Sequence, residues 1–136
     1  MSRGDPERFD VFLSHAPADA VLAEAVRQRL AEAGLTCYSI LSGEGDGDSL
    51  EDRLRHALDI SRAYVAVLSR SFVQSPNLLI EVGAAWAAEL PTFFLLNDVR
   101  PTEVPAFFGR FKSYRLWDGL PKLIAAVREL PERQSV

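Results

Sequence analysis

The segment 63–69 reads Ala-Tyr-Val-Ala-Val-Leu-Ser and is apolar almost throughout. A strand with one face in water alternates apolar and polar residues, so this run indicates a strand covered on both faces. Such strands lie at the centre of parallel sheets, whose neighbouring strands are joined by helical crossovers. The run therefore favours an α/β fold.

Strand-like and helix-like segments alternate along the rest of the chain. Short apolar runs predict four further strands, at 9–14, 36–41, 92–96 and, at a sheet edge, 112–117. Amphipathic spacing predicts helices at 20–33, 75–90 and 120–130, and one capped by Ser49 that buries Leu50, Leu54, Ala57 and Leu58. Pro101 and Pro105 predict that 97–111 is an irregular connection.

The order of these elements predicts the architecture. Five strands alternating with helices indicate a flavodoxin-like three-layer sandwich, with a five-stranded parallel sheet of order 2-1-3-4-5 and helices on both faces. A chain of 136 residues fits one domain. We expect a flexible lead-in over 1–8, the domain over 9–130 and a tail over 131–136.

Composition limits the partners. The net charge of −4 argues against a nucleic-acid surface, because phosphate binding needs clustered Lys and Arg. The single cysteine, Cys37, excludes an internal disulfide and lies in a β-like run, which predicts a buried thiol. No stretch approaches the roughly 20 apolar residues of a membrane span, and the N-terminus lacks a signal-peptide pattern. We therefore expect a cytoplasmic location without membrane contact.

Glu81 is the charged residue whose setting is most suggestive. Ser75 is a good N-cap and Pro76 suits the first helical position, so a helix opens here with Glu81 in its second turn. On the same side lie Asn77 and three small residues, Ala84, Ala85 and Ala88. Small neighbours leave room for a ligand beside the carboxylate. The alternative is a helix glutamate in water.

The expected topology brings Glu81 toward two residues that are distant in sequence. In a 2-1-3-4-5 sheet the winding reverses between the first and third strands, and ligands bind at the carboxyl ends of the strands there. Ser14 and His15 follow the first strand, and residues 69–75 lead from the third strand into the Glu81 helix. The glycine-rich acidic loop 42–49 would hang beside this crevice as a lid.

A carboxylate in such a crevice suits the cleavage of an N-glycosidic bond, whose transition state resembles an oxocarbenium ion. His15 could bind a phosphate or a base edge. Trp86 and Trp117 are interpreted as core residues. Asp46 and Asp48 lack the ligand spacing of a calcium loop, and no metal site is expected. Neither a Walker sequence nor a G-x-G-x-x-G follows the first strand.

A set of short motifs, taken in order, resembles one family. Ser14 and Asp19 form an S-x-x-x-x-D turn after the first strand, Ser61 precedes the third strand, and Ser69 leads to Glu81. Further matching segments are 9–15, 30–35, 47–50 and 67–69, with Phe72 and Ser75. The chain resembles bacterial TIR (Toll/interleukin-1 receptor) domains from about Phe9 to Leu130.

This resemblance implies the flavodoxin-like fold and, for many bacterial members, hydrolysis or cyclisation of NAD at the nicotinamide–ribose bond. NAD would be the substrate, with no cofactor. The catalytic glutamate of the family corresponds to Glu81. The positions implied to contact substrate are Ser14, His15, Ser42, Gly43, Asp46, Ser69 and Asn77.

The resemblance also implies partners. TIR domains of this kind are effector modules in bacterial immune or antiphage signalling. They are activated when a sensor domain in a longer parent protein multimerises and the domains stack through the BB loop, here 41–49.

Two alternatives remain open. Asn77 stands where many enzymatic members have Trp, and the BB loop is acidic, with Asp46 in place of the usual Pro. Both departures favour a non-enzymatic TIR module that works by homotypic assembly. The run Glu81-Val82-Gly83-Ala84-Ala85 also resembles nucleoside deoxyribosyltransferases, which would exchange bases on deoxynucleosides.

Overall fold

The computed structural model describes residues 8–40 and 49–132, and it holds one parallel sheet. Its strands are β1 (Phe9–Ser14), β2 (Cys37–Tyr38), β3 (Ser61–Leu68), β4 (Thr92–Leu96) and β5 (Lys112–Arg115). Their order is β2-β1-β3-β4-β5, which confirms the predicted flavodoxin-like topology. The bounds of β1 and β4 are those predicted.

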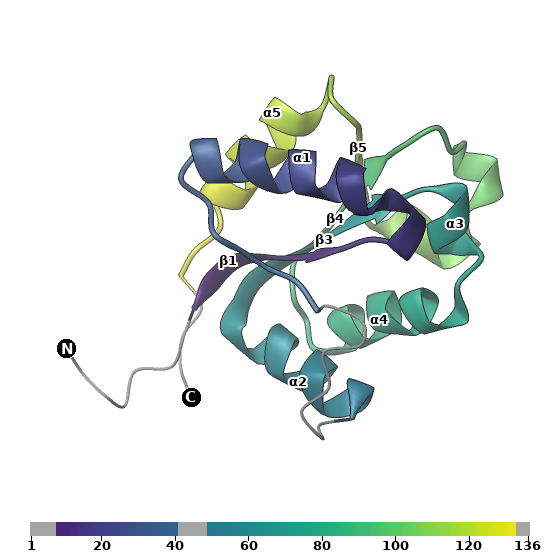
Figure 1. Cartoon of the computed structure of the whole chain (residues 1–136), viewed down its shortest axis with the longest axis horizontal. Helices are drawn as coiled ribbons and strands as arrows, with labels where there is room; N and C mark the ends of the chain where they lie inside the picture. The colour runs from purple at the N-terminus through teal and green to yellow at the C-terminus, as the bar shows by residue number, and fades with distance from the viewer. Residues whose placement is uncertain (1–7, 41–48, 133–136) are drawn as a thin grey trace.

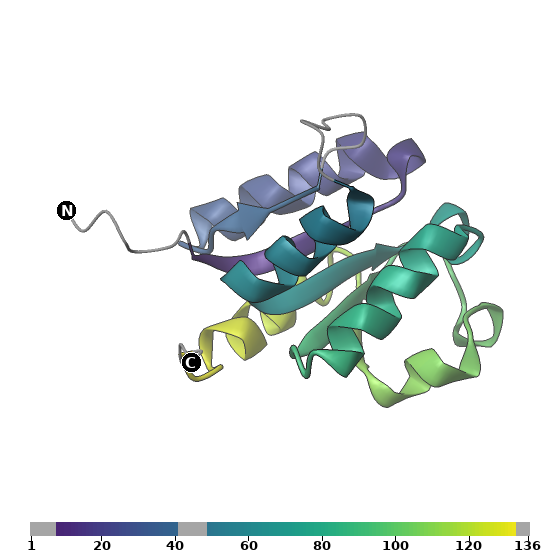
Figure 2. The same ribbon diagram turned by 90° about the horizontal axis from the view of Figure 1, so that it is seen from below.

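Four longer helices cover the sheet. α1 (Ala20–Glu32) and α5 (Leu120–Arg128) lie on one face, and α2 (Leu50–Ile60) and α4 (Pro76–Ala87) lie on the other (Figure 1). Figure 2 shows α2 and α4 side by side across their face. The predicted three layers are therefore confirmed.

Alternate residues of β3 enter two separate cores. Ala63, Val65 and Val67 pack with the α1 and α5 side, whereas Tyr64, Ala66 and Leu68 pack with the α2 and α4 side. Because both faces of this strand are covered, neither can be polar. The unbroken apolar run of β3 is thus explained as predicted, by a strand that is covered on both faces.

Several element bounds differ from the prediction. The central strand β3, predicted over 63–69 with Ser61 before it, begins at Ser61 and ends at Leu68. β2 pairs with β1 only at Cys37 and Tyr38, and beyond them the Ser39 hydroxyl, 3.4 Å from the Leu13 carbonyl oxygen, donates to it. A side chain there takes the place of a ladder bond, so the strand is shorter than predicted. β5 is an edge strand as predicted, but it ends at Arg115, shortly before Trp117 adopts a φ of 66°.

The helices differ in smaller ways. Ser49 caps α2 as predicted, but Leu50 is 45% exposed and Ile60 is buried, so the predicted buried face was wrong at its first residue. α4 ends at Ala87, before Glu89 at a φ of 60°. The predicted turn between Ser14 and Asp19 contains the 3-10 turn η1 (Pro17–Asp19), whereas the single-turn helix α3 (Arg70–Val73) was not predicted. The connection 97–111 contains the 3-10 turns η2 (Pro101–Glu103) and η3 (Ala106–Arg110).

Arg62 fastens the end of α5 to the start of the sheet. Its guanidinium donates to Asp10 at 2.9 Å and to the carbonyl oxygens of Leu130 at 2.6 Å and Val127 at 3.4 Å. Burial works to raise the pKa of Asp10, but hydrogen bonds from Thr36 and Arg62 outweigh it and hold that pKa below its usual value. Within the described residues, no helix combines the length and apolar character needed to cross a bilayer.

Candidate active site

Helix α4 places Glu81 against the sheet. The Ser75 hydroxyl accepts from the Leu78 amide at 3.4 Å and Pro76 occupies the first turn, so the helix starts as predicted. Glu81, one turn later, is only 9% exposed. The alternative of a glutamate in water is therefore wrong, and the carboxylate lies inside the fold.

Two hydroxyls from neighbouring strands meet this carboxylate. In the parallel register Ser14 lies opposite Ala66 and Phe12 lies opposite Tyr64, so Ser14 and Tyr64 share the sheet face toward α4. The Ser14 hydroxyl and the Tyr64 hydroxyl, the latter at 3.0 Å, both donate to Oε1 of Glu81. Among the described residues, none donates to Oε2. The predicted approach of Ser14 to Glu81 is seen in the structure.

Sequence reasoning missed Tyr64. Its signal was a phenolic hydroxyl inside an otherwise apolar strand, where a buried O–H usually needs a partner. The run was read for its apolar character, so this hydroxyl was not assigned a role.

The electrostatics of the carboxyl are set by opposing effects. Burial raises the pKa of Glu81, and the hydrogen bonds from Ser14 and Tyr64 and the charge of His15 lower it, with a net rise above the ordinary value. Burial and the nearby Glu81 charge raise the pKa of Tyr64 well above its usual value, so its hydroxyl stays a neutral donor. Such a carboxyl changes charge at a higher pH than an exposed one.

His15 borders the same site. It is half-buried, and Nδ1 lies 2.8 Å from the carbonyl oxygen of Ala16. A carbonyl oxygen only accepts, so Nδ1 is the donor in this contact. His15 is thus brought near Glu81, as the topology predicted.

Ser69 ties two loops of the crevice together. Its hydroxyl donates to Oδ2 of Asp19 at 2.5 Å and accepts from the Phe72 amide at 3.1 Å, which makes it the N-cap of α3. The hydroxyl is therefore engaged by protein groups in the absence of a ligand. Its predicted substrate contact stays a prediction.

The remaining predicted site residues are Asn77 and three residues of the loop 42–49. Asn77 is exposed in the first turn of α4. Ser42, Gly43 and Asp46 fall outside the described residues, as does nearly all of the predicted lid. Their contacts with substrate stay predictions.

Other reactive groups do not form a second centre. Cys37 is largely buried, and burial raises its pKa to about 12, which keeps the thiol protonated at neutral pH. In 8–40 and 49–132 no three His, Cys, Asp or Glu side chains are grouped as a metal site would require. Trp86 and Trp117 are 49% and 39% exposed, so their predicted core positions were wrong.

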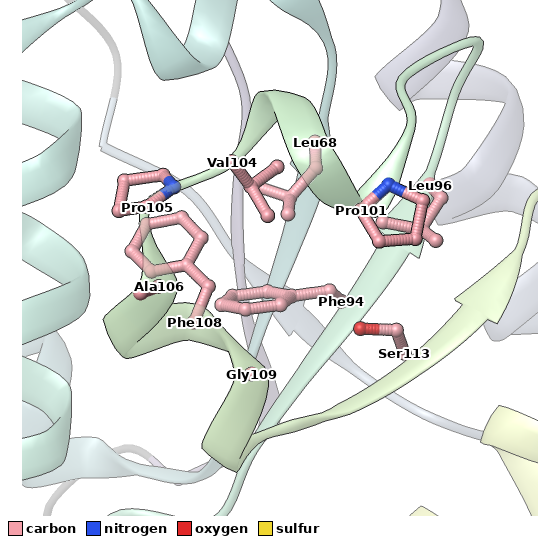
Figure 3. Close-up of a pocket in the computed structure, with 10 residues that line it drawn as sticks. All are labelled: Leu68, Phe94, Leu96, Pro101, Val104, Pro105, Ala106, Phe108, Gly109 and Ser113. Carbon is pink, nitrogen blue, oxygen red and sulfur yellow. The ribbon is translucent and has the colours of Figure 1, made fainter.

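An apolar cavity of about 240 Å³ lies under the connection from β4 to β5 (Figure 3). Figure 3 shows the Phe94 ring among the other lining side chains, with the Ser113 hydroxyl beside it. No lining residue is charged, which makes it unsuited to phosphate groups. The lining residues are Leu68, Phe94, Leu96, Pro101, Val104, Pro105, Ala106, Phe108, Gly109 and Ser113.

Comparison with known proteins identifies a family model and a relative. The model described as "TIR domain" matches residues 11–130. The probable 2′ cyclic ADP-D-ribose synthase of Brachypodium distachyon is 27% identical over 103 residues, which cover 74% of this chain and 46% of the relative. The chain thus spans about half the length of that protein.

Solved structures resemble this one in fold. The TIR domain of a Toll-related receptor from Hydra magnipapillata is 19% identical with a TM-score of 0.70, covering 89% of this chain and 99% of that one. A TIR-STING receptor from C. gigas is 17% identical with a TM-score of 0.73, over 96% and 44%. The TIR domains of the activated Roq1 resistosome are 21% identical with a TM-score of 0.60, over 90% and 82%.

Proposed function

This chain belongs to the TIR domain family, and from that premise we propose that it cleaves the nicotinamide–ribose bond of NAD. One observation carries the proposal. Glu81, a buried carboxyl with a raised pKa, is held by two hydroxyls at the switch point of a parallel sheet. Ligands of such sheets bind at this point, and perturbed carboxyls gather at functional sites.

The proposed chemistry uses Glu81 as an ionised group. Its carboxylate accepts hydrogen bonds from the nicotinamide ribose hydroxyls and stabilises the positive charge that develops on the ribose. The C–N bond breaks and nicotinamide leaves with the bonding electron pair as a neutral molecule. Water, or a nucleophile within the ADP-ribose itself, adds to the cation and releases a proton. NAD is the substrate in this scheme, and Glu81 is the catalytic residue.

Product choice is part of the proposal. The Brachypodium relative is named a probable 2′ cyclic ADP-D-ribose synthase, which supports a cyclic product beside linear ADP-ribose. His15, half-buried beside the site, is proposed to contact the nucleotide, with Ser14 and the BB loop.

We also propose that self-association activates the enzyme. The outer side of α4 supports this, because Ile80 is 65% exposed and Trp86 is 49% exposed. Glu81, the one charged residue of α4, faces inward. Large exposed apolar side chains on one helix are typical of contact surfaces. In this proposal the domains stack through residues 41–49, and a sensor domain in a longer parent protein brings them together. The biological role proposed is bacterial antiviral signalling.

The test is nicotinamide release from NAD by the purified protein at high concentration with a crowding agent. Glu81→Gln is the variant of choice, because an amide oxygen still accepts from Tyr64, whereas Ala would orphan a buried hydroxyl at about 1–3 kcal/mol. We expect release by the wild type and at least a 100-fold loss in Glu81→Gln. Undiminished release by the variant would contradict the assignment of Glu81.

A second candidate is a non-enzymatic module that acts by homotypic assembly. The exposed side chains of α4 and the replacement of Trp by Asn77 favour it. It predicts concentration-dependent association without loss of NAD, even in assembled protein. The base-exchange alternative gains no support from a family match that spans residues 11–130.

A further inference from the structure

We propose that Tyr64 is a positioning residue for the reaction. With Ser14 it holds Oε1 of Glu81 and leaves Oε2 to meet the substrate. The inference rests on the proposed function, and it adds a residue that neither the sequence analysis nor the comparisons assign.

The hydroxyl of Tyr64 has no packing reason to be there. Tyr64 is fully buried, and its ring lies edge-on to Phe12 at a centroid distance of 5.2 Å. Phenylalanine would fill the same space without placing an O–H in an apolar core. The O–H instead donates to Glu81 at 3.0 Å. A buried donor is costly without a partner, so we infer that the hydroxyl of Tyr64 is present for its hydrogen bond to the Glu81 carboxylate.

The two donors reach one oxygen from two different strands. Ser14 is the last residue of β1, and Tyr64 lies inside β3, so both come from the rigid centre of the sheet. Two fixed donors on one oxygen set the rotation of the carboxylate as well as its position. A group aligned before substrate binds loses less freedom in the transition state.

Tyr64 and Ser14 also stabilise the charged form of Glu81. Among the residues that the structure describes, the titratable groups that act on this carboxyl are Tyr64 on β3 and His15 after β1. Tyr64 itself stays protonated, so it acts as a donor and not as an acid in turnover. Removal of its hydroxyl therefore leaves Glu81 harder to ionise, and moves the dependence of turnover on pH.

The experiment compares Tyr64→Phe with Tyr114→Phe. Tyr114→Phe removes the same hydroxyl group from a residue of β5, whose ring packs in the core on the α1 and α5 side of the sheet. The Glu81 carboxyl is followed by carbon-13 NMR against pH in the full chain without NAD, with Glu81→Gln to assign the signal. We expect a higher titration midpoint in Tyr64→Phe and in Ser14→Ala, and an unchanged midpoint in Tyr114→Phe.

Turnover gives the second readout. In Tyr64→Phe we expect kcat at neutral pH to fall about tenfold, the size of one charge-assisted hydrogen bond, and to recover partly at higher pH. A merely structural loss would not recover in this way. An unchanged midpoint in Tyr64→Phe, or an equal shift in Tyr114→Phe, overturns the inference. The titration needs no NAD. An inactive wild type would therefore refute the proposed function, while the titration midpoints would still show whether the Tyr64 hydroxyl affects the Glu81 carboxyl.

Discussion

At the scale of single residues, the candidate site holds a buried carboxyl that the proposed reaction uses in its charged form. Glu81 is surrounded by the α2 and α4 core, and its charge is supported by two hydroxyls and the neighbouring His15. Burial favours the neutral acid, and the donors favour the anion. The balance determines the pH range in which the site is charged before substrate arrives.

This balance predicts how stability changes with pH. The folded protein binds a proton at Glu81 more tightly than the unfolded chain does, since the pKa is raised on folding. That contribution is fully present below the unfolded pKa of about 4.5 and is lost as pH rises through the folded pKa. Urea unfolding from pH 4 to 8 should therefore show wild type losing stability relative to Glu81→Gln. Two curves that stay parallel over this range would contradict the raised pKa.

The residues of the site were predictable where topology alone decides their place. Ser14, His15 and Glu81 follow from the strand order, because each stands next to a strand end or at a helix start. Tyr64 was missed because its contact with Glu81 depends on how α4 packs against β3, which periodicity does not give. The engagement of Ser69 by Asp19 was missed for a similar reason, since it joins residues 50 apart.

At the scale of elements, α4 is less stable than it could be, because it contains a glycine. Gly83 lies in its interior, where glycine is less favourable than alanine by about 0.5–1 kcal/mol. A Cβ added there would meet nothing within 4 Å. Gly83→Ala should therefore stabilise the protein by about 0.5–1 kcal/mol, measured by urea unfolding.

Gly119 is the matched control for this change. A Cβ at Gly119 would lie 2.8 Å from Cβ of Tyr114 and 2.9 Å from the backbone of Arg115. Gly119→Ala should therefore destabilise the protein in the same assay. A loss of stability in Gly83→Ala would show that its open space is needed.

The inner strands β1 and β4 were predicted more closely than the edge strands β2 and β5. β1 and β4 are flanked by strands on both sides, and their apolar runs match their bounds because every residue is packed or paired. β2 has one neighbour and ends where a serine side chain replaces the backbone ladder. α3 has four residues, too few for a helical period to be visible in sequence.

At the scale of the whole molecule, the proposed assembly predicts a separable defect. Ile80 is 65% exposed on α4, so Ile80→Glu should fold normally and yet associate less, because it places a charge in an apolar contact. Val21 on α1 is 87% exposed and offers the matched control, Val21→Glu. We expect Ile80→Glu alone to lower both the sedimentation coefficient at high concentration and the release of nicotinamide. Equal behaviour of the two variants would remove α4 from the assembly surface.

The Arg62 contacts have a mechanical consequence. They hold Leu130 beside Asp10, so the chain enters and leaves the described fold at the amino ends of the strands (Figure 1). Glu81 lies toward their carboxyl ends, because it contacts Ser14, the last residue of β1. A tether joined at either terminus thus pulls on the edge remote from Glu81. Force applied along both termini would first load the contacts of Arg62, and the edge that carries Glu81 would stay free to turn toward a neighbouring copy.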